Sequence, residues 1–299
     1  MSTTKRVWAM AFLTFGAVCA YADDEPQATK RLCATEAPSG LERARVVSTL
    51  SYFRQANAKF AGLKGSIEVP VAFHVLQNGD AGNLTDAVLE AQIDALNLAF
   101  KPYNIRFRRV SASHTDNASY FTMGYKSAVE RAAKKNLGKD PEQQLNFYTA
   151  DLAGELLGWA TFPSDLAGDP ERDGVVVHYQ SLPGGAKAHF DQGKTAVHEV
   201  AHWLGLFHTF EGGCVVPGDE VDDTPFEGKD ASGCPDPQPD TCPAPGMDPI
   251  HNYMDYSYDA CMTEFTPGQG ARMREQVATF RPALLSSSLK SAVKPFEIK

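Results

Sequence analysis

One stretch of eleven residues constrains this chain more than any other feature of its sequence. It spaces His198, Glu199, His202, Gly205 and His208 as H-E-x-x-H-x-x-G-x-x-H. The first two histidines are four residues apart, so a helix places them on one face, where both imidazoles reach one zinc ion. The glycine allows the positive φ that ends such a helix and turns the third histidine back towards the metal. Three nitrogen ligands leave the fourth zinc position open, which is typical of a catalytic site.

Glu199 directly follows the first histidine, and we expect it to act as a general base. Its side chain is poorly placed to be a ligand but lies near the open zinc position, where a water molecule gives up a proton during hydrolysis. The alternative is a helix with ordinary, hydrogen-bonded histidines. A chance match to five fixed positions in a chain of this length has a probability on the order of 10⁻⁴.

The start of the chain has the pattern of a secretory signal peptide. Two basic residues precede an apolar run from 7 to 20, which ends in the A-x-A cleavage motif of residues 20–22. The run is short for a membrane span. We therefore expect residues 1–22 to be removed from a secreted, extracellular protein.

The rest of the chain divides into three parts. Residues 23–64 are polar and charged, with helical stretches, and are interpreted as a pro-segment. Residues 65–285 are expected to form one α+β catalytic domain, in which a twisted mixed sheet with backing helices and the zinc-site helix precedes an irregular subdomain. Strands are predicted at 67–76, 105–110, 144–149, 158–162 and 174–179, and helices at 85–100, 125–137, from about 195 and at 266–280. The polar tail, residues 286–299, is expected to be flexible.

The residues that follow the zinc motif resemble the metzincin zinc proteases and, within them, the pappalysin family. The matching blocks include the methionine turn at 251–256 (H-N-Y-M-D-Y), residues 222–225 (D-D-T-P) and residues 265–269 (F-T-P-G-Q). The resemblance covers about residues 65–282 and extends to secreted fungal and bacterial metalloproteases. It implies a metzincin-like fold and a secreted zinc-dependent endopeptidase that hydrolyses peptide bonds of extracellular proteins.

The same resemblance implies roles for three residues beyond the zinc motif. Met254 would form the apolar floor beneath the metal. The Tyr256 hydroxyl would stabilise the oxyanion of the reacting peptide bond, although an ordinary buried aromatic residue explains the same position. Asp259 would lie at the base of the S1′ pocket and favour Arg or Lys after the scissile bond, whereas the alternative is a residue of a solvated loop.

Four cysteines follow the zinc motif, and an oxidising compartment favours their pairing. Spacing alone allows three pairings of Cys214, Cys234, Cys242 and Cys261. The resemblance implies the disulfides Cys214–Cys242 and Cys234–Cys261, each of which would close a loop in a segment that has few apolar residues.

An acidic stretch in the irregular subdomain offers oxygen ligands for calcium. It contains Asp219, Asp222, Asp223 and Thr224 but lacks the spacing of an EF-hand. A solvated loop explains the same residues, and the resemblance to proteases that carry calcium in this region favours a site.

Cys33 is the one cysteine in the first half of the chain after the signal peptide. It is either a free or intermolecular thiol, or a latency switch whose thiolate takes the fourth zinc position. The resemblance to proteases with a similar cysteine-centred segment favours the switch. A cut between residues 33 and 67 would then activate the precursor.

The net charge of the chain restricts the classes of partner that it can bind. A net charge of −9 argues against nucleic acid and against a membrane-binding face. We expect a monomer that acts on protein or peptide substrates. The alternative function is a catalytically silent zinc-binding protein that serves as a secreted decoy or interaction module, and the presence of Glu199 argues against it.

Overall fold

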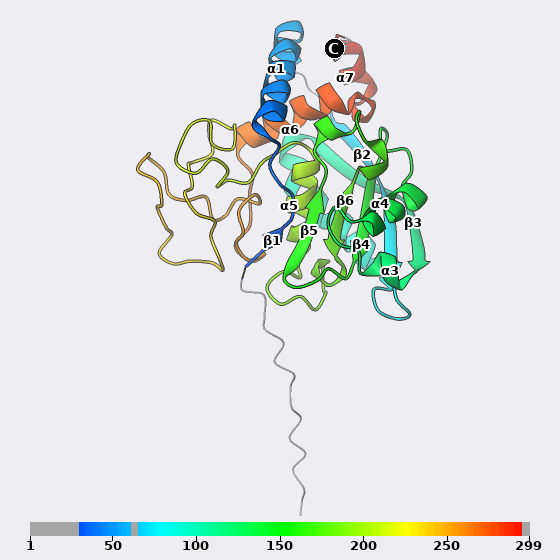
Figure 1. Ribbon diagram of the computed structural model, residues 1–299. Helices are drawn as coiled ribbons and strands as arrows, with labels where there is room; N and C mark the ends of the chain where they lie inside the picture. The colour runs from blue at the N-terminus through cyan, green and yellow to red at the C-terminus, as the bar shows by residue number, and fades with distance from the viewer. Residues whose placement is uncertain (1–29, 61–64, 295–299) are drawn as a thin grey trace, which may run out of the picture.

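The computed structural model describes residues 30–60 and 65–294, so the expected signal peptide lies outside the described residues. The strands are β1 Leu32–Cys33, β2 Ile67–Gln77, β3 Ile105–Asp116, β4 Leu145–Ala150, β5 Leu156–Ala160 and β6 Val175–His178. The α-helices are α1 Gly40–Ala56, α2 Asp86–Phe100, α3 Ala118–Phe121, α4 Ala128–Leu137, α5 Lys194–Trp203, α6 Pro267–Phe280 and α7 Ser287–Ala292. Figure 1 shows a sheet and its helices on one side of the molecule and irregular loops on the other.

One mixed sheet joins all six strands in the order β1-β5-β6-β4-β2-β3. The pairs of β2 with β3, β2 with β4 and β4 with β6 are parallel, whereas β5 runs antiparallel to β6. The first strand, β1, pairs with β5 in parallel and forms one edge of the sheet. The α+β class and the mixed sheet expected from the sequence are therefore confirmed.

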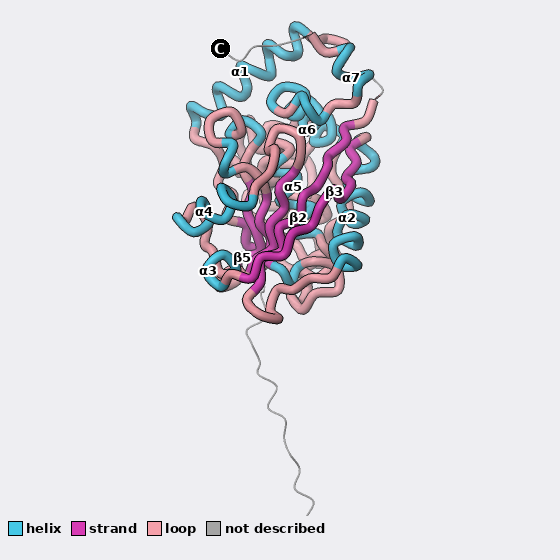
Figure 2. Tube along the Cα trace, turned by 90° about the vertical axis from the view of Figure 1, so that its right-hand side faces the viewer, coloured by secondary structure: helices cyan, strands magenta, loops and turns pink. Residues whose placement is uncertain are grey.

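Helices cover both faces of the sheet (Figure 2). Alternate side chains of the central strands point to opposite faces, and along β2 the residues Val71, Phe73 and Val75 join the large apolar cluster with α2, α5 and α6. Leu76 joins the smaller cluster on the other face, with side chains from α3 and α4. Burial on both faces explains why these strands are apolar along most of their length.

The helix that carries the zinc motif, α5, packs on β5 and β6 and is buried along its whole length. It ends at the glycine expected to turn the chain. Gly205 has φ of +101°, and a Cβ atom there would come within 2.5 Å of the Gln276 side chain. Both the turn and the contact with α6 therefore require glycine.

The molecule has one half built from helices and strands and another half built from irregular loops. We call residues 67–203 the sheet half and residues 206–265 the loop half. The loop half, every residue of which is described, has no helix or strand beyond isolated bridges. The disulfides Cys214–Cys242 and Cys234–Cys261 cross it, with Cα separations of 5.3 and 5.6 Å. These are the two pairs that the resemblance implies.

The C-terminal tail differs from its expected flexible state. Residues 287–292 form α7, and Leu289 on this helix is 1% exposed within the large apolar cluster. Leu289 and the partly buried Val293 thus anchor a segment that is largely polar, which is why its composition gave no sign of folding. The last five residues lie outside the described part.

The N-terminal segment, residues 30–60, consists of β1, a connection and α1. The helix begins with a capping box between Ser39 and Glu42. Val46, Leu50 and Phe53 are its buried residues, and α1 packs against α6 at the top of Figure 1. The segment therefore lies on the catalytic part of the chain rather than apart from it.

Candidate metal centre and active site

Three buried imidazoles converge where α5 leaves the sheet half. His198 and His202 lie one turn apart on α5, and His208 follows the turn at Gly205. The Nε2 atom of His202 is 3.2 Å from Nε2 of His198 and 3.1 Å from Nε2 of His208. The spacing of the motif predicted this convergence.

Hydrogen bonds at Nδ1 of His198 and His202 fix which nitrogen of each ring faces the other histidines. His198 Nδ1 lies 2.7 Å from the Tyr253 carbonyl and His202 Nδ1 lies 2.8 Å from the Leu206 carbonyl. A carbonyl only accepts, so each Nδ1 carries the hydrogen and each Nε2 directs a lone pair towards the centre. Burial lowers the pKa of His202 to about 4 and holds the pKa values of His198 and His208 below their usual range. Three neutral nitrogen donors that face one another fit a zinc ion.

Cys33 completes this cluster from the N-terminal segment. Its Sγ and one ring nitrogen of each of the three histidines all lie within 4.8 Å of one another. The strand β1 brings it there, because Cys33 pairs with Gly158 of β5 and the Ala34 amide donates to the Gly158 carbonyl at 3.0 Å. This position is the one that the latency-switch hypothesis expects for the Cys33 thiol.

Glu199 lies beside the cluster, and two side chains contact one oxygen of its carboxylate. The Thr35 hydroxyl donates to Glu199 Oε2 at 3.2 Å, and Cys33 Sγ is 3.4 Å from the same oxygen. Burial raises the pKa of Glu199 to about 8. Gly158 makes room for this side chain, since a Cβ atom there would be 2.8 Å from Glu199 Cγ. The carboxylate is therefore held against β5, next to the inward-facing nitrogens.

The loop half contributes Met254 and Tyr256 to the region around His208. Met254 is fully buried, and its carbonyl accepts the Thr209 amide at 3.2 Å. The Tyr256 hydroxyl lies 3.3 Å from His208 Nε2 and donates to the Cys33 carbonyl at 3.4 Å. The methionine turn is thus tied to the segment that carries the third histidine, and a tyrosine hydroxyl reaches the centre.

Asp259 is buried and not part of a solvated loop, so that alternative is wrong. Its exposed fraction is 1%, and its Oδ1 lies 2.5 Å from a guanidinium nitrogen of Arg31. Its Oδ2 accepts the amides of Gln192 and Lys194, just before and at the start of α5. The Arg31 guanidinium also donates to the Thr195 hydroxyl at 2.9 Å. The N-terminal segment therefore places a basic side chain on the carboxylate expected in the S1′ pocket.

The four expected calcium ligands divide into two pairs. Asp219 and Thr224 are buried, and Asp219 Oδ2 and the Thr224 hydroxyl have no hydrogen-bond partner among the described residues. Asp222 and Asp223 are exposed, and Asp223 accepts a hydrogen bond from the Thr266 hydroxyl at the start of α6. The structure therefore leaves acceptor oxygens unused at Asp219 and Thr224, whereas Asp223 caps a helix.

Three residues in contact with the site carried no role in the sequence-based prediction: Arg31, Thr35 and Gly158. A signal for two of them was present. Arg31, Cys33 and Thr35 alternate along the chain, and alternate residues of an extended strand share a face. Gly158 gave no such signal, because its reason is the close approach of Glu199 from a distant helix.

Relatives of this chain agree with the geometry. A family model described as Peptidase_M43, pregnancy-associated plasma protein-A, matches residues 134–278. Extracellular metalloprotease 1 of Coccidioides posadasii is 41% identical over 276 residues, which cover 90% of this chain and 96% of the relative. The chain belongs to the Peptidase_M43, or pappalysin, family. An extracellular metalloprotease of Verticillium alfalfae is 44% identical over 73% of this chain and 78% of its own length.

Solved structures of mirolysin share the fold. A mutant of Tannerella forsythia promirolysin has a TM-score of 0.74 and 29% identity, and the match covers 89% of this chain and all of that one. Mature mirolysin with a cleaved peptide has a TM-score of 0.66 and 31% identity over 78% of this chain. The protein is a secreted zinc metalloendopeptidase, as the sequence predicted. Among the described residues, no helix has the length and apolar character needed to cross a membrane.

Proposed function

We propose that His198, His202 and His208 hold the zinc ion and that Glu199 is the general base of a peptidase acting on extracellular proteins. The observation that carries this assignment is the convergence of three lone pairs beside a buried carboxylate. Zinc, when bound, polarises a peptide carbonyl and lowers the pKa of a water molecule. Glu199 takes a proton from the attacking water and passes it to the leaving amine. The Tyr256 hydroxyl donates to the carbonyl oxygen as negative charge develops there.

We propose further that the N-terminal segment keeps the precursor latent. Cys33 supplies a thiolate for the fourth zinc position, which the attacking water needs, and the Thr35 hydroxyl holds the base. Arg31 fills the pocket at Asp259 as a basic substrate side chain would. In support, the solved promirolysin matches 89% of this chain whereas mature mirolysin matches 78%. Residues 23–64 would then be the pro-segment, and a cut between residues 33 and 67 would release it.

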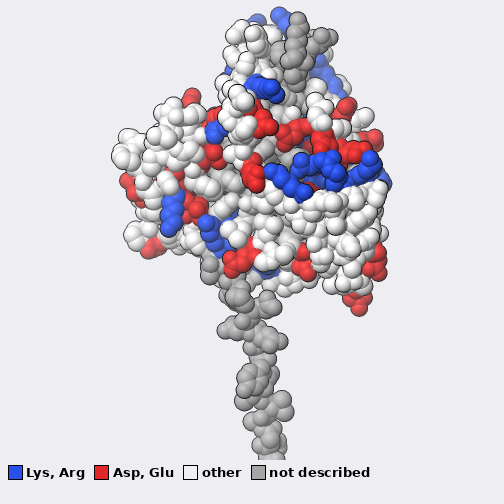
Figure 3. Space-filling model, in the orientation of Figure 1, with Lys and Arg blue, Asp and Glu red and all other residues white. Residues whose placement is uncertain are grey.

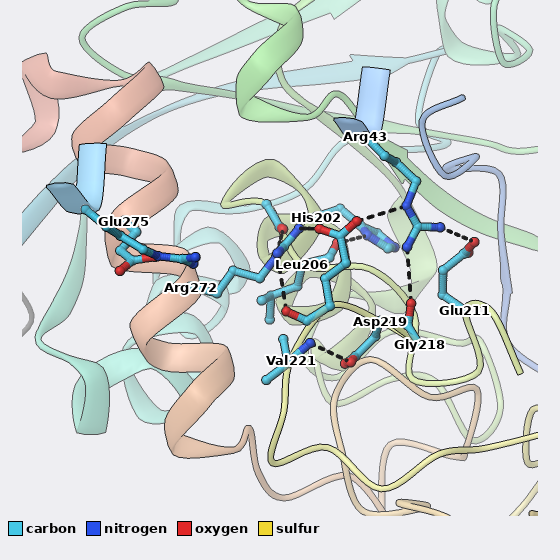
Figure 4. Close-up of polar contacts among 12 residues, drawn as sticks. Arg43, His202, Leu206, Glu211, Gly218, Asp219, Val221, Arg272 and Glu275 are labelled. Atoms are coloured by element: carbon cyan, nitrogen blue, oxygen red, sulfur yellow. Dashed lines mark hydrogen bonds and ion pairs between the residues drawn. The ribbon is translucent and has the colours of Figure 1, made fainter. Parts of the chain in front are cut away.

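A second set of ion pairs fastens α1 to the loop half (Figure 4). Arg43 donates to Glu211 at 3.1 Å, to Glu220 at 3.0 Å and to the Gly218 carbonyl at 3.1 Å. Glu220 also pairs with Arg272 of α6, whose Nε donates to the Gly205 carbonyl at 2.9 Å. We propose that this network holds the pro-segment in register with the turn that leads to His208.

The preference of the mature enzyme follows from the pocket that Arg31 occupies. Asp259 would attract Arg or Lys at the position after the scissile bond, with the Thr195 hydroxyl as a second acceptor. The Phe190 ring lies 5.2 Å from the Arg31 guanidinium and would stack on a substrate arginine in the same way.

Asp219 and Thr224 are our proposed contributors to a calcium site in the loop half. Burial raises the pKa of Asp219 to about 7, because loss of water disfavours the charged carboxylate. Asp222 lies in the same turn and would complete the site from the solvent side, as Asp223 would if it released α6.

We propose that the enzyme acts as a monomer without nucleic acid or membrane partners. The band of basic side chains on the face in Figure 3 is bordered by acidic ones. Ion pairs of this kind join Arg131 to Asp169 and Lys135 to Glu171. Such a mixed surface suits neither a phosphate backbone nor an anionic bilayer.

The test uses Glu199→Gln and the wild type, both cut with trypsin between residues 33 and 67 and then freed of trypsin activity. General-base catalysis contributes at least about 10²-fold, so casein hydrolysis should fall by at least that factor while each chain retains one zinc. Glu142→Gln, at an exposed position, is the control. Wild-type turnover by zinc-loaded Glu199→Gln removes Glu199 from the mechanism. A zinc-loaded wild type that hydrolyses nothing supports the silent binding protein instead.

A further inference from the structure

A hollow lies between the N-terminal segment and the sheet half. Its volume is about 430 Å³. The N-terminal segment contributes residues 36–39 and Glu42 to its lining, and the sheet half contributes residues 125–126 and 160–162 among others. Loss of the proposed pro-segment would therefore remove one wall of this hollow and leave the other wall open to a substrate.

The path of the N-terminal segment along β5 fixes which side of the active site the hollow occupies. Arg31 lies at Asp259, and Cys33, two residues later, lies among the three histidines. Further along the segment, the Ala160 amide donates to the Thr35 hydroxyl oxygen at 2.8 Å. The hollow begins at Ala160, so the hollow and Asp259 flank the zinc centre on opposite sides. If Asp259 receives the residue after the scissile bond, the hollow receives residues before it.

An ion pair joins the two walls of the hollow. Glu36 Oε2 of the N-terminal segment lies 2.7 Å from Lys126 Nζ of the sheet half. Release of the segment would take away this carboxylate and leave the Lys126 ammonium on the open wall. An acidic side chain of a substrate could then replace Glu36.

The backbone of Lys126 is held by contacts that do not involve Glu36. Its φ is +56°, a conformation that residues other than Gly adopt only where the surroundings hold it. The Lys126 amide donates to Glu130 at 2.7 Å, and Trp159 Nε1 donates to the same carboxylate at 2.6 Å. The Tyr125 ring lies 5.0 Å from the Lys126 ammonium and adds a cation–π contact. Since Trp159 belongs to β5, Lys126 would keep its place beside this strand in the mature enzyme.

The other charged side chains of the sheet half in this hollow do not cancel the charge of Lys126. Asp165 accepts a backbone amide at 3.1 Å, and burial raises its pKa. Asp169 pairs with Arg131 at 3.1 Å. Arg172 also lines the hollow and adds a second positive charge. The open wall would therefore attract an acidic side chain.

We propose that Lys126 is a specificity-determining residue of the mature enzyme, which binds an Asp or Glu side chain about three residues before the scissile bond. The position follows from Glu36, which lies three residues beyond Cys33, at the rise of an extended chain. The inference rests on the proposed function, because it requires release of the N-terminal segment and a basic substrate residue at Asp259. A preferred substrate would then carry an acidic side chain before the scissile bond and a basic one after it.

The expected preference is modest, because the Lys126 and Glu36 side chains are 49% and 69% exposed even when paired. Ion pairs at exposed positions correspond to a preference of about two- to fivefold. Salt should weaken the preference, because it screens charges in contact with solvent.

The experiment compares three peptides that have Arg after the scissile bond and Glu, Gln or Lys three residues before it. Mature wild type, freed of its pro-segment by the same trypsin treatment, should have a kcat/KM about two- to fivefold higher for the Glu peptide than for the Gln peptide. Salt at about 1 M should bring this ratio towards one.

Variants of Lys126 assign the preference to its charge. Lys126→Gln should lower the ratio to about one and hydrolyse the Gln peptide as fast as wild type, whereas Lys126→Glu should favour the Lys peptide. Lys126→Arg should retain the preference. Lys139→Gln, at an exposed lysine outside the hollow, is the matched control and should also retain it. Should Lys126→Gln fail to fold, Lys126→Asn takes its place, because Asn tolerates a positive φ.

Two results would overturn the inference and leave the proposed peptidase function intact. Equal hydrolysis of the Glu and Gln peptides by wild type would exclude a subsite for acidic side chains. A preference that Lys126→Gln leaves unchanged would assign it to another residue. A wild type that hydrolyses none of the three peptides would instead remove the proposed function, and this inference with it.

Discussion

The sheet half and the loop half are of similar importance to the active site but are held together by different forces. The sheet half buries mainly Val, Leu, Ile and Phe between a hydrogen-bonded sheet and its helices. The loop half has two disulfides and five buried carboxylates, which are Asp219, Glu227, Asp248, Asp255 and Asp259. Apolar burial organises the first half, whereas the second half combines two disulfides and buried carboxylates with the apolar residues that it adds to the large cluster.

This difference explains how the zinc centre is divided. His198 and His202 belong to a helix whose position is fixed by packing on the sheet, while His208, Met254 and Tyr256 belong to loops. The first two proposed ligands should remain in place when the loop half is disturbed. Geometry at the third ligand depends on the disulfides and on the charges buried near them.

The largest expected effects on stability come from one variant in each half, and comparing them tests whether the halves unfold independently. Replacing Cys214 and Cys242 together by Ser should lower the free energy of unfolding by about 3–4 kcal/mol, because the disulfide closes a loop of 28 residues. Leu96→Ala, in the large apolar cluster, should cost about 2–5 kcal/mol. Hydrogen exchange distinguishes the two. The disulfide variant should lose amide protection in the loop half only, and equal loss in β2 and β4 would mean that the halves are not independent.

A smaller effect concerns the strand that joins the two halves. Cys33→Ala should raise the casein-hydrolysing activity of the precursor about 100-fold, which corresponds to roughly 2.7 kcal/mol lost from the latent state. The exposed Ser51 of α1 supplies the control, Ser51→Ala, which should leave latency unchanged. A Cys33→Ala precursor as inactive as wild type would show that the pro-segment blocks the site by bulk alone.

The smallest expected effect is on cleavage specificity and comes from removing the charge of Asp259 in the loop half. Asp259→Asn retains the shape of the side chain and loses its charge, so cleavage before Arg and Lys should fall about tenfold relative to cleavage before Leu. The ratio of the two rates on a peptide library is the measurement. Thr195→Ala should lower the ratio less, because a hydroxyl is a weaker acceptor. An unchanged ratio in Asp259→Asn would exclude Asp259 as the residue that reads the substrate.

The sequence predicted the sheet half well because its order is visible in periodic patterns. The alternation along 105–110 and the four-residue spacing in α5 follow from packing against a core. Residues 212–250 have no such period, so the buried positions of Glu227 and Asp248 could not be derived from local pattern. The folding of residues 287–292 was missed for a related reason, since only Leu289 and the adjacent Val293 pack on the large apolar cluster.

The zinc motif itself was predictable because all of its residues lie within eleven positions. The contacts of Arg31 and Thr35 with the site span more than 160 residues of sequence. Nothing in the polar N-terminal segment indicates which distant strand it will pair with. Local chemistry therefore predicted the metal and suggested Glu199 as the base, whereas the proposal that the N-terminal segment blocks them required the three-dimensional arrangement.

The parallel pairing of β1 with β5 has a further consequence for the activated protein. Once β1 departs, the β5 edge presents unpaired amide and carbonyl groups, which is a template for any extended chain. That edge would accept a substrate peptide, but it would equally accept the released pro-segment or a strand from a neighbouring molecule. Release of the proposed pro-segment would thus replace the β1 edge of the sheet by the β5 edge, and self-association of the mature enzyme through that edge would depend on its concentration.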